Sequence, residues 1–350
     1  MRKSIAIIIT SILVLSGCNK QQSVSDRLLN EVEKAIAINP DSASNLLKGI
    51  SSPEKLDNKT FARWCMLSGK ITDEIFNSIL PTYQLERAYD WYSSHGSPDE
   101  QVQILIYLGR SYFADGDYDK AMSIYTNALD IAEKNKLNNL TGYTYSYIGD
   151  LYGEKFMRTE AIKRYKAAAE CFKKENNTDS YACALRDVGR EYACIDSLSR
   201  ALKILTIADS VARNTKNIEV TASIDNALGN IYAMQNKYDK AEEYFLKALV
   251  GRETMPDYMA LIDLYIASGA INKAQELLSK ILQDNPKYTY SIKYLYYQIY
   301  NEEKNYKEAL TNLKEYVEIT DSIIYADNQS KILNIESKYC LLYTSPSPRD

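Results

Sequence analysis

Few residues of this sequence are of a type that could perform acid–base, nucleophilic or metal chemistry. His95 is the single histidine among 350 residues, and it stands in a predicted turn between Ser94 and Gly96. Without a second histidine, Ser/His and Cys/His nucleophile pairs lack their base and histidine-rich metal sites lack their ligands. The sequence also has no glycine loop of the kind that binds phosphate. We therefore expect no catalytic site, no metal site and no bound cofactor.

The internal cysteines have no metal-binding or redox spacing. They are Cys65, Cys171, Cys183 and Cys194, and no two of them form a CxxC pair. Cys183 and Cys194 are expected on one helix, about 16 Å apart at 1.5 Å per residue, which is too far for a disulfide. Cys171 and Cys183 flank a predicted helix connection, so a bridge between them is one reading. The alternative is that these cysteines are small buried side chains.

Another group of polar side chains is suited to binding an anion or a peptide. Arg186 and Arg190 are four residues apart and so share one face of a predicted helix, and Asn226 and Asn230 hold the same two positions forty residues later. Guanidinium and amide donors in this arrangement suit a carboxylate or an extended peptide backbone. An ordinary solvated helix face is the alternative.

The elements that must position these donors repeat every forty residues. Each repeat has a glycine, then a tyrosine three residues later, a large residue sixteen residues later, and alanines twelve and nineteen residues later. Because small side chains let two helices approach and large ones fill the space between them, this pattern predicts a pair of antiparallel helices per unit. The positions that we expect to pack the repeats are Gly109, Gly149, Gly189, Gly229, Ala121, Ala161, Ala201 and Ala241.

The period exceeds the 34 residues of the simplest helical repeat of this kind. Stretches rich in Asn, Lys and Thr at 134–140, 173–180 and 213–219 favour helix ends and turns. Longer connections and longer helices would both account for the surplus. Two further units without the glycine are expected around Tyr265 and Tyr300.

The repeat pattern resembles the tetratricopeptide repeat, most strongly over residues 99–286. The resemblance implies an all-α fold, a right-handed superhelical solenoid of antiparallel helix pairs, with about six units in residues 99–318. It also implies that the first helix of each unit lines a concave groove. Within this groove, the donors Arg186, Arg190, Asn226 and Asn230 only loosely resemble the carboxylate clamp of chaperone-binding family members. The candidate groove residues are Ile106, Arg110, Ser146, Asp150, Arg186, Arg190, Asn226, Asn230, Met259, Asp263, Tyr294 and Gln298.

The segments that flank the regular units are also predicted to be helical. Residues 26–98 fit an irregular capping or repeat-like region, in which Pro40 opens a helix with Asn39 as its cap. Residues 319–339 start a long helix that either closes the solenoid or begins a coiled coil. Its near-heptad apolar residues are Ile319, Ile323, Ala326 and Leu333.

The amino terminus predicts export and lipid attachment. Residues 1–17 have a basic start and about a dozen apolar residues, a run that is typical of a signal peptide and too short to span a bilayer. The LSGC sequence that ends at Cys18 resembles the bacterial lipobox, which implies a diacylglycerol thioether on Cys18 and a lipidated tether over residues 18–25. The alternative is an ordinary signal peptide followed by a chance cysteine. We expect a lipid-anchored protein of the bacterial cell envelope that faces the periplasm.

The last residues differ in composition from everything before them. CLLYTSPSPRD at 340–350 resembles the translation of a transposon-derived sequencing adaptor. We therefore expect these residues to be non-native, the 319–339 helix to be truncated, and the natural chain to continue beyond Tyr339. A genuine tail is the alternative.

The composition and the predicted shape limit the kinds of ligand that this protein could bind. With a net charge of −4 and no lysine and arginine stripe, this segment is not expected to bind nucleic acid. A helical solenoid offers a long surface, which suits a protein or peptide better than a small molecule. We expect a noncatalytic binding protein. Two roles compete: the sensory or interaction region of a larger signalling protein, resembling repeat regulators with a membrane span and a DNA-binding domain, and a scaffold lipoprotein for envelope or outer-membrane assembly.

Overall fold

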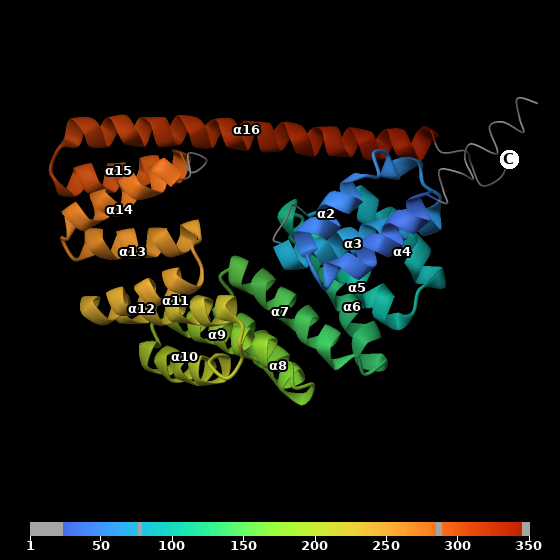
Figure 1. Ribbon diagram of the computed structural model, residues 1–350, viewed down its shortest axis with the longest axis horizontal. Helices are drawn as coiled ribbons and strands as arrows, with labels where there is room; N and C mark the ends of the chain where they lie inside the picture. The colour runs from blue at the N-terminus through green and yellow to red at the C-terminus, as the bar shows by residue number, and fades with distance from the viewer. Residues whose placement is uncertain (1–23, 76–78, 285–288, 345–350) are drawn as a thin grey trace, which may run out of the picture. The chain divides into compact units, whose positions relative to one another are not determined.

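The computed structural model describes residues 24–75, 79–284 and 289–344, and every regular element in these ranges is a helix (Figure 1). This confirms the all-α prediction. The chain divides into two compact units, Met1–Thr144 and Tyr145–Asp350.

The first unit begins with a helix over residues 24–36. Asn39 then caps α2, because its Oδ1 accepts a 2.9 Å hydrogen bond from the Ser42 amide, and Pro40 is the first residue of that helix. Both predictions are confirmed. The elements of this unit are α2 (Pro40–Lys48), η1 (Pro53–Lys55), α3 (Asn58–Ile75), α4 (Thr82–His95), α5 (Pro98–Ala114), α6 (Tyr118–Lys134) and the start of α7 (Asn138–Glu154).

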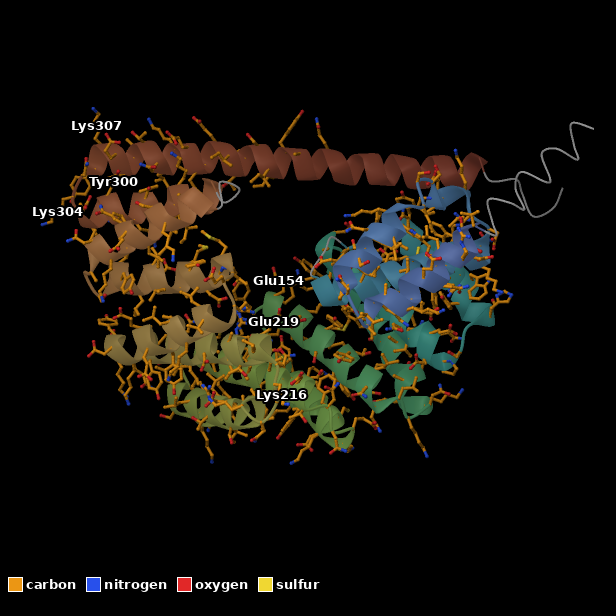
Figure 2. All side chains as sticks on the ribbon, in the orientation of Figure 1. Glu154, Lys216, Glu219, Tyr300, Lys304 and Lys307 are labelled. Carbon is orange, nitrogen blue, oxygen red and sulfur yellow. The ribbon has the colours of Figure 1, made fainter. Side chains whose placement is uncertain are left out.

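The second unit contains the rest of α7 and the helices that follow it. Residues 306–318 and 319–339, which the sequence analysis treated separately, form one continuous helix, α16 (Figure 1). Figure 2 shows Tyr300, Lys304 and Lys307 grouped at the turn that leads into it. The other helices are α8 (Arg158–Lys174), α9 (Thr178–Cys194), α10 (Leu198–Ala212), α11 (Ile218–Met234), α12 (Tyr238–Gly251), α13 (Met255–Ala267), α14 (Ile271–Asp284), α15 (Thr289–Glu302) and α16 (Tyr306–Thr344).

Helix length accounts for the forty-residue period. The helices α5 to α9 each have 17 residues, and three-residue connections join them. Of the two explanations left open for the surplus, longer helices are the one observed, and the polar stretches mark helix ends: Asn177 and Asn217 are N-caps whose side chains accept from the amides of Ser180 and Val220. Asparagine favours this position because its carbonyl oxygen satisfies an amide that the helix leaves unpaired.

The repeat glycines make room for a large side chain of the partner helix. A Cβ added to Gly149 would lie 2.7 Å from the Tyr165 ring, and one added to Gly189 would lie 2.6 Å from Leu205. Contacts this short do not occur between real carbon atoms, so an alanine there would force the helices apart. Gly109 and Gly229 face Tyr125 and Phe245 in the same way, and the second-helix alanines Ala121, Ala161, Ala201 and Ala241 are fully buried.

The α3–α4 pair shares the register of the later repeats, which the sequence analysis missed. Gly69 precedes Gly109 by forty residues, and Leu85 and Ala88 hold the large and small positions of the second helix and are buried. The pair differs from the other units in having Pro81 where they have the first alanine. That proline marks the start of α4 instead of a position inside it.

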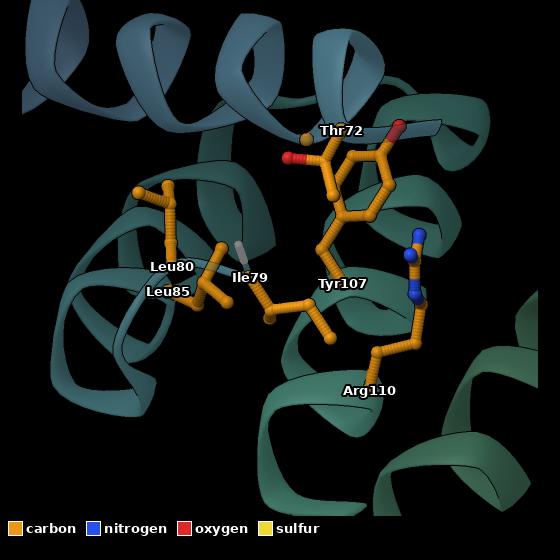
Figure 3. Close-up of a pocket in the computed structure, with 7 residues that line it drawn as sticks. Thr72, Ile79, Leu80, Leu85, Tyr107 and Arg110 are labelled. Atoms are coloured by element: carbon orange, nitrogen blue, oxygen red, sulfur yellow. The ribbon is translucent and has the colours of Figure 1, made fainter. Parts of the chain in front are cut away.

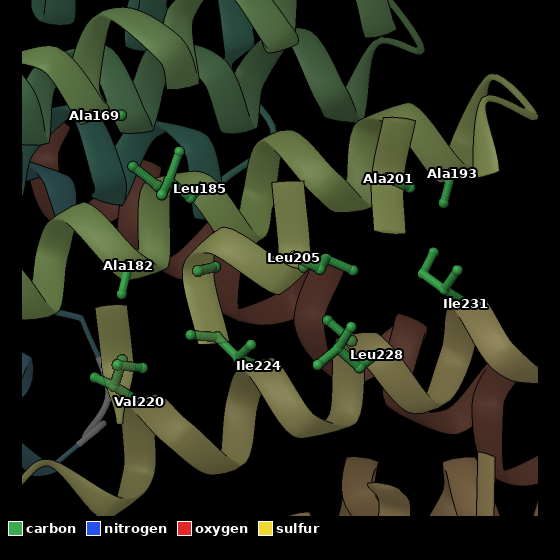
Figure 4. Close-up of a cluster of buried hydrophobic side chains, with 14 of the residues drawn as sticks. Ala169, Ala182, Leu185, Ala193, Ala201, Leu205, Val220, Ile224, Leu228 and Ile231 are labelled. Carbon is green, nitrogen blue, oxygen red and sulfur yellow. The ribbon is translucent and has the colours of Figure 1, made fainter. Parts of the chain in front are cut away.

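The core of the second unit is a continuous set of small and branched side chains. Figure 4 shows Leu205 of α10 beside Ile224 and Leu228 of α11, and all three belong to one buried cluster that spans α8 to α11. This packing fixes the first helices of successive pairs against each other, and α9 contacts α11 as α11 contacts α13. The exposed faces of these first helices carry the candidate site.

Candidate ligand-binding surface

Four exposed polar residues occupy the same position in successive repeats of the second unit. Each lies one residue after the glycine position, or its equivalent, on the first helix of its pair. They are Asp150 on α7, Arg190 on α9, Asn230 on α11 and Asp263 on α13, and we call them the polar row. All four belong to the predicted groove set.

Arg186, the candidate one turn before Arg190, is held by other protein groups. Its Nε and Nη2 donate to the two oxygens of Asp187 at 2.9 and 3.1 Å, and its Nη1 donates to Ser223 Oγ at 3.0 Å. Burial disfavours its charge, but Asp187 more than compensates and raises the pKa of Arg186. Because Ser223 lies on α11, this guanidinium links two repeats.

Arg190 is the more available cation. Its side chain is 66% exposed, and its Nη1 lies 3.8 Å from Asp187 Oδ1, beyond hydrogen-bond distance. The guanidinium therefore has donors free for an external acceptor.

Asp150 accepts a 2.6 Å hydrogen bond from the Tyr165 hydroxyl. Although Asp150 is exposed, the protein atoms crowded around its carboxyl raise its pKa to about 6; Asp187 adds to this, while the Tyr165 hydrogen bond and the nearby arginines oppose it. The carboxyl therefore gains its charge near neutral pH and not near pH 4.

Asn226 is bonded to other protein groups, as Arg186 is, whereas Asn230 is more available to a ligand, as Arg190 is. Asn226 Nδ2 donates to Asp257 Oδ1 at 2.8 Å, and Asp257 is itself fully buried and paired with Arg252. Asn230 Nδ2 donates at 3.0 Å to both the backbone and the side-chain oxygen of Asn226. Asn226 thus fixes the amide nitrogen of Asn230, and the Asn230 Oδ1 accepts no hydrogen bond from the residues that the structure describes.

Asp263 completes the polar row, and Met259, Tyr294 and Gln298 are candidates outside it. Burial raises the pKa of Asp263. Tyr294 packs on Tyr316, with ring centroids 5.2 Å apart, and Gln298 has a buried Oε1 without a hydrogen-bond partner among the described residues. Met259 packs against a core cluster. A buried carbonyl without a donor is unfavourable by about 1–3 kcal/mol, so Gln298 is a natural acceptor for a ligand or water.

The two candidates of the first unit do not form such a surface. Ile106 is buried in the core, because it is apolar and its helix faces neighbours there. Arg110 pairs with Asp73 and borders a cavity of about 10 Å³ beside Tyr107 and Leu85 (Figure 3). Such a cavity holds no more than a single water.

The cysteines and the histidine singled out for chemistry each have structural surroundings. Cys171 and Cys183 are not joined by a disulfide, so the bridge that was one reading of the sequence is not present. His95 is the last residue of α4 and not a turn residue, and its ring stacks on Trp91 while Nδ1 lies 3.0 Å from the Trp91 carbonyl. Across the described ranges, no group of three or more His, Cys, Asp or Glu side chains is placed to hold a metal.

The predicted amino-terminal features fall where the structure gives no description. Cys18 and the predicted signal peptide over 1–17 lie outside the described residues, as do residues 345–350. None of the helices within the described part has the length and apolar character needed to cross a membrane.

Comparisons with known proteins support the repeat assignment. Sequence models of the tetratricopeptide repeat match residues 105–138 and 221–255. No match was found among curated proteins. The matched segments are therefore tetratricopeptide repeats, as the sequence predicted, and they lie in the α5–α6 and α11–α12 pairs.

Several solved structures have a similar fold. A Rap protein complexed with Competence and Sporulation Factor has a TM-score of 0.66 and 18% identity, over 87% of this chain and 88% of that chain. NprR in complex with its cognate peptide NprX has a TM-score of 0.52 and 15% identity, over 93% and 98%. A tetratricopeptide repeat protein from Parabacteroides merdae has a TM-score of 0.53 and 16% identity, over 78% and 99%. At these identities the likeness is one of fold.

Proposed function

We propose that this chain is a noncatalytic, peptide-binding or protein-binding lipoprotein of the bacterial cell envelope, and that its ligand binds along the polar row. The observation that carries the proposal is the contrast between two layers. Residues one turn before the row, Arg186 and Asn226, are bonded to groups of the neighbouring repeat, whereas Arg190 is exposed without a hydrogen bond to Asp187 and Asn230 keeps its Oδ1 available. Exposed polar groups above a layer of hydrogen-bonded residues suit the recognition of a ligand.

The spacing of the row suits an extended polypeptide. Packed helices lie about 8–10 Å apart, and an extended chain rises about 3.3 Å per residue. Every third residue of such a ligand would therefore meet the next member of the row. The row offers a carboxyl, a guanidinium, an amide and a second carboxyl in turn, so the complementary ligand has an acidic or carbonyl group opposite Arg190 and basic or amide groups at either end.

The similar structures add support of a limited kind. The Rap structure is a complex with Competence and Sporulation Factor, and the NprR structure is a complex with its cognate peptide NprX. Transferring a peptide ligand to this chain is part of our proposal, because the shared property is the fold.

The envelope location is proposed from the sequence. Residues 1–18 combine a basic start, an apolar core and LSGC, so we propose removal of the leader and acylation of Cys18. Two or more acyl chains would anchor the protein stably. We favour a sensory role, in which the bound ligand is reported to later parts of a longer protein.

Peptide selection with single-residue variants tests the proposal. A random peptide library is selected on the wild-type chain, and the selected peptides are then titrated against Arg190→Ala and Asn230→Ala. We expect each substitution to weaken binding about tenfold, the loss of one charge-assisted or buried hydrogen bond. Lys203→Ala, which removes an exposed cation from the second helix of the same pair, is the matched control. Equal affinity for all variants would refute the site.

A further inference from the structure

The second helix of a repeat pair uses two positions to contact the pair that follows. These positions lie thirteen and twenty residues after the glycine position. In α8 they are Ile162 and Ala169, which are 6% and 3% exposed and belong to clusters with side chains of α9. In α12 they are Glu242, which accepts a 2.8 Å hydrogen bond from Tyr265, and Leu249, which packs against the α13–α14 cluster.

In α16 the same two positions are apolar and uncovered. They are Leu310 and Val317, which are 53% and 46% exposed. Ile324 follows one heptad later on the same side of the helix and is 52% exposed. The outer side of α16 is therefore an apolar stacking face, which we call the α16 stripe: Leu310, Val317 and Ile324.

We propose that the α16 stripe packs against the same stripe of a second copy of this chain, so that two chains associate about a two-fold axis. The stripe is symmetric about Val317, with Leu310 and Ile324 seven residues to either side. In an antiparallel pair, Val317 therefore meets its counterpart, and Leu310 meets Ile324 of the partner subunit. A two-fold interface requires this kind of self-complementary surface.

The charges beside the stripe favour the same arrangement. Lys314 and Asp321 are exposed and flank the stripe on one side, seven residues apart. With the two helices antiparallel about Val317, Lys314 of each chain lies opposite Asp321 of the partner subunit, which gives two ion pairs. A parallel pairing would place Lys314 near Ala309 and Asp321 near Tyr316, and neither is a charge partner. The stripe thus carries both the shape and the charge pattern for an antiparallel second copy.

Disulfide trapping tests the position of the axis. The full chain carrying Val317→Cys is oxidised with copper phenanthroline and analysed on a non-reducing gel, with the wild-type chain as the background from its native cysteines. We expect a cross-linked dimer well above that background. Glu318→Cys is the matched control, because it is exposed at the same height on α16 but faces another way. Equal cross-linking at 317 and 318, or none at 317, would overturn the proposal.

Charge reversal tests the orientation independently, in detergent-solubilised full chain studied by sedimentation. We expect Lys314→Glu and Asp321→Lys each to weaken dimerisation about tenfold, because each replaces two attractions with two repulsions. The double variant should regain wild-type dimerisation. A chain that stays monomeric, as it would if a further helix of its own covered the stripe, or a double variant no better than the single ones, would disprove the antiparallel dimer. Neither experiment depends on the proposed ligand.

Discussion

Gly149 and Gly153 lie one turn apart on α7, yet only one of them lacks room for a side chain. A Cβ at Gly149 would fall 2.7 Å from the Tyr165 ring, whereas the nearest atom to a Cβ at Gly153 is Glu191 Oε1, at 3.4 Å. Only the first glycine is therefore required by packing. The second costs the helix conformational entropy without a close contact in return.

Alanine substitutions at these two glycines should have opposite effects. We expect Gly149→Ala to lower the free energy of unfolding by about 1–3 kcal/mol, because overpacking displaces Tyr165. Gly153→Ala should leave it unchanged or raise it by up to about 1 kcal/mol, the difference in helix propensity. Urea unfolding followed by circular dichroism measures both. Equal losses would show that the glycines are needed for a reason other than the contact with Tyr165.

The carboxyl of Asp150 should make the free energy of unfolding depend on pH. Its folded pKa of about 6 lies above the unfolded value of about 3.9, so the folded state binds the extra proton between these pH values. The contribution of Asp150 to stability is therefore full below pH 4 and is lost as pH rises through 6. In Asp150→Asn, which keeps an acceptor for Tyr165, that loss should be missing when unfolding is measured from pH 4 to 7.5. Parallel pH profiles would contradict the raised pKa.

At the scale of the element, equivalent turns of successive repeats share one backbone conformation. The residues at the tips of four turns, each forty residues after the last, have positive φ: Gly116 at 78°, Phe156 at 58°, Asp196 at 56° and Asn236 at 58°. Glycine, asparagine and aspartate adopt this left-handed conformation readily, but a bulky residue does so at a cost of about 1–2 kcal/mol. Phe156 is also 80% exposed, so little packing offsets that cost.

Replacing Phe156 should therefore stabilise the second unit. We expect Phe156→Asn to raise the free energy of unfolding by about 1 kcal/mol, after allowing for the lost contact between its ring and Arg158. The same substitution at the equivalent Asp196 should have little effect, since aspartate already tolerates the conformation. Thermal and urea unfolding of the two variants make the comparison. A loss of stability in Phe156→Asn would mean that the exposed ring packs in a way the turn geometry does not explain.

Arg186 and Arg190 lie one turn apart on α9 but should have separable roles. Arg186 links α9 to Ser223 on α11, so we expect Arg186→Ala to destabilise the fold by about 1–3 kcal/mol, the cost of leaving its partner Asp187 unpaired. Arg190→Ala should leave stability within about 0.5 kcal/mol and weaken only a ligand. Unfolding and peptide titration on the same two proteins separate these outcomes. A stable Arg186→Ala protein that binds peptide poorly would reverse our assignment.

The sequence predicted the helix pairs and placed the residues of the polar row on the first helix of each pair, because the small and large residues recur at fixed offsets. It missed the α3–α4 pair, where Thr72 and Pro81 replace the tyrosine and alanine of the pattern. It also ranked Arg186 with Arg190, since a shared helix face follows from spacing alone. That Asp187 and Ser223 use the Arg186 donors depends on side-chain direction and on the next repeat, which spacing does not specify.

At the scale of the whole molecule, the chain divides into two compact units with different surfaces. The second unit holds the whole polar row and the α16 stripe, whereas Arg110 of the first unit is already paired with Asp73. Repeat proteins couple mainly through nearest neighbours, so a ligand that spans α7 to α13 would stiffen four successive pairs at once. This stiffening is the physical basis of the sensory role that we propose, and the ligand and the proposed dimer contact both lie in the second unit.

The most direct test of the central claim is a charge swap at Arg190 read out by ligand sequence. One random peptide library is selected in parallel on the wild-type chain, on Arg190→Glu, and on the control Lys203→Glu. If the polar row reads the ligand, wild type and the control will select an acidic residue at one peptide position, and Arg190→Glu will select a basic residue there. The same consensus from all three proteins, or no enrichment on the wild-type chain, would contradict the account.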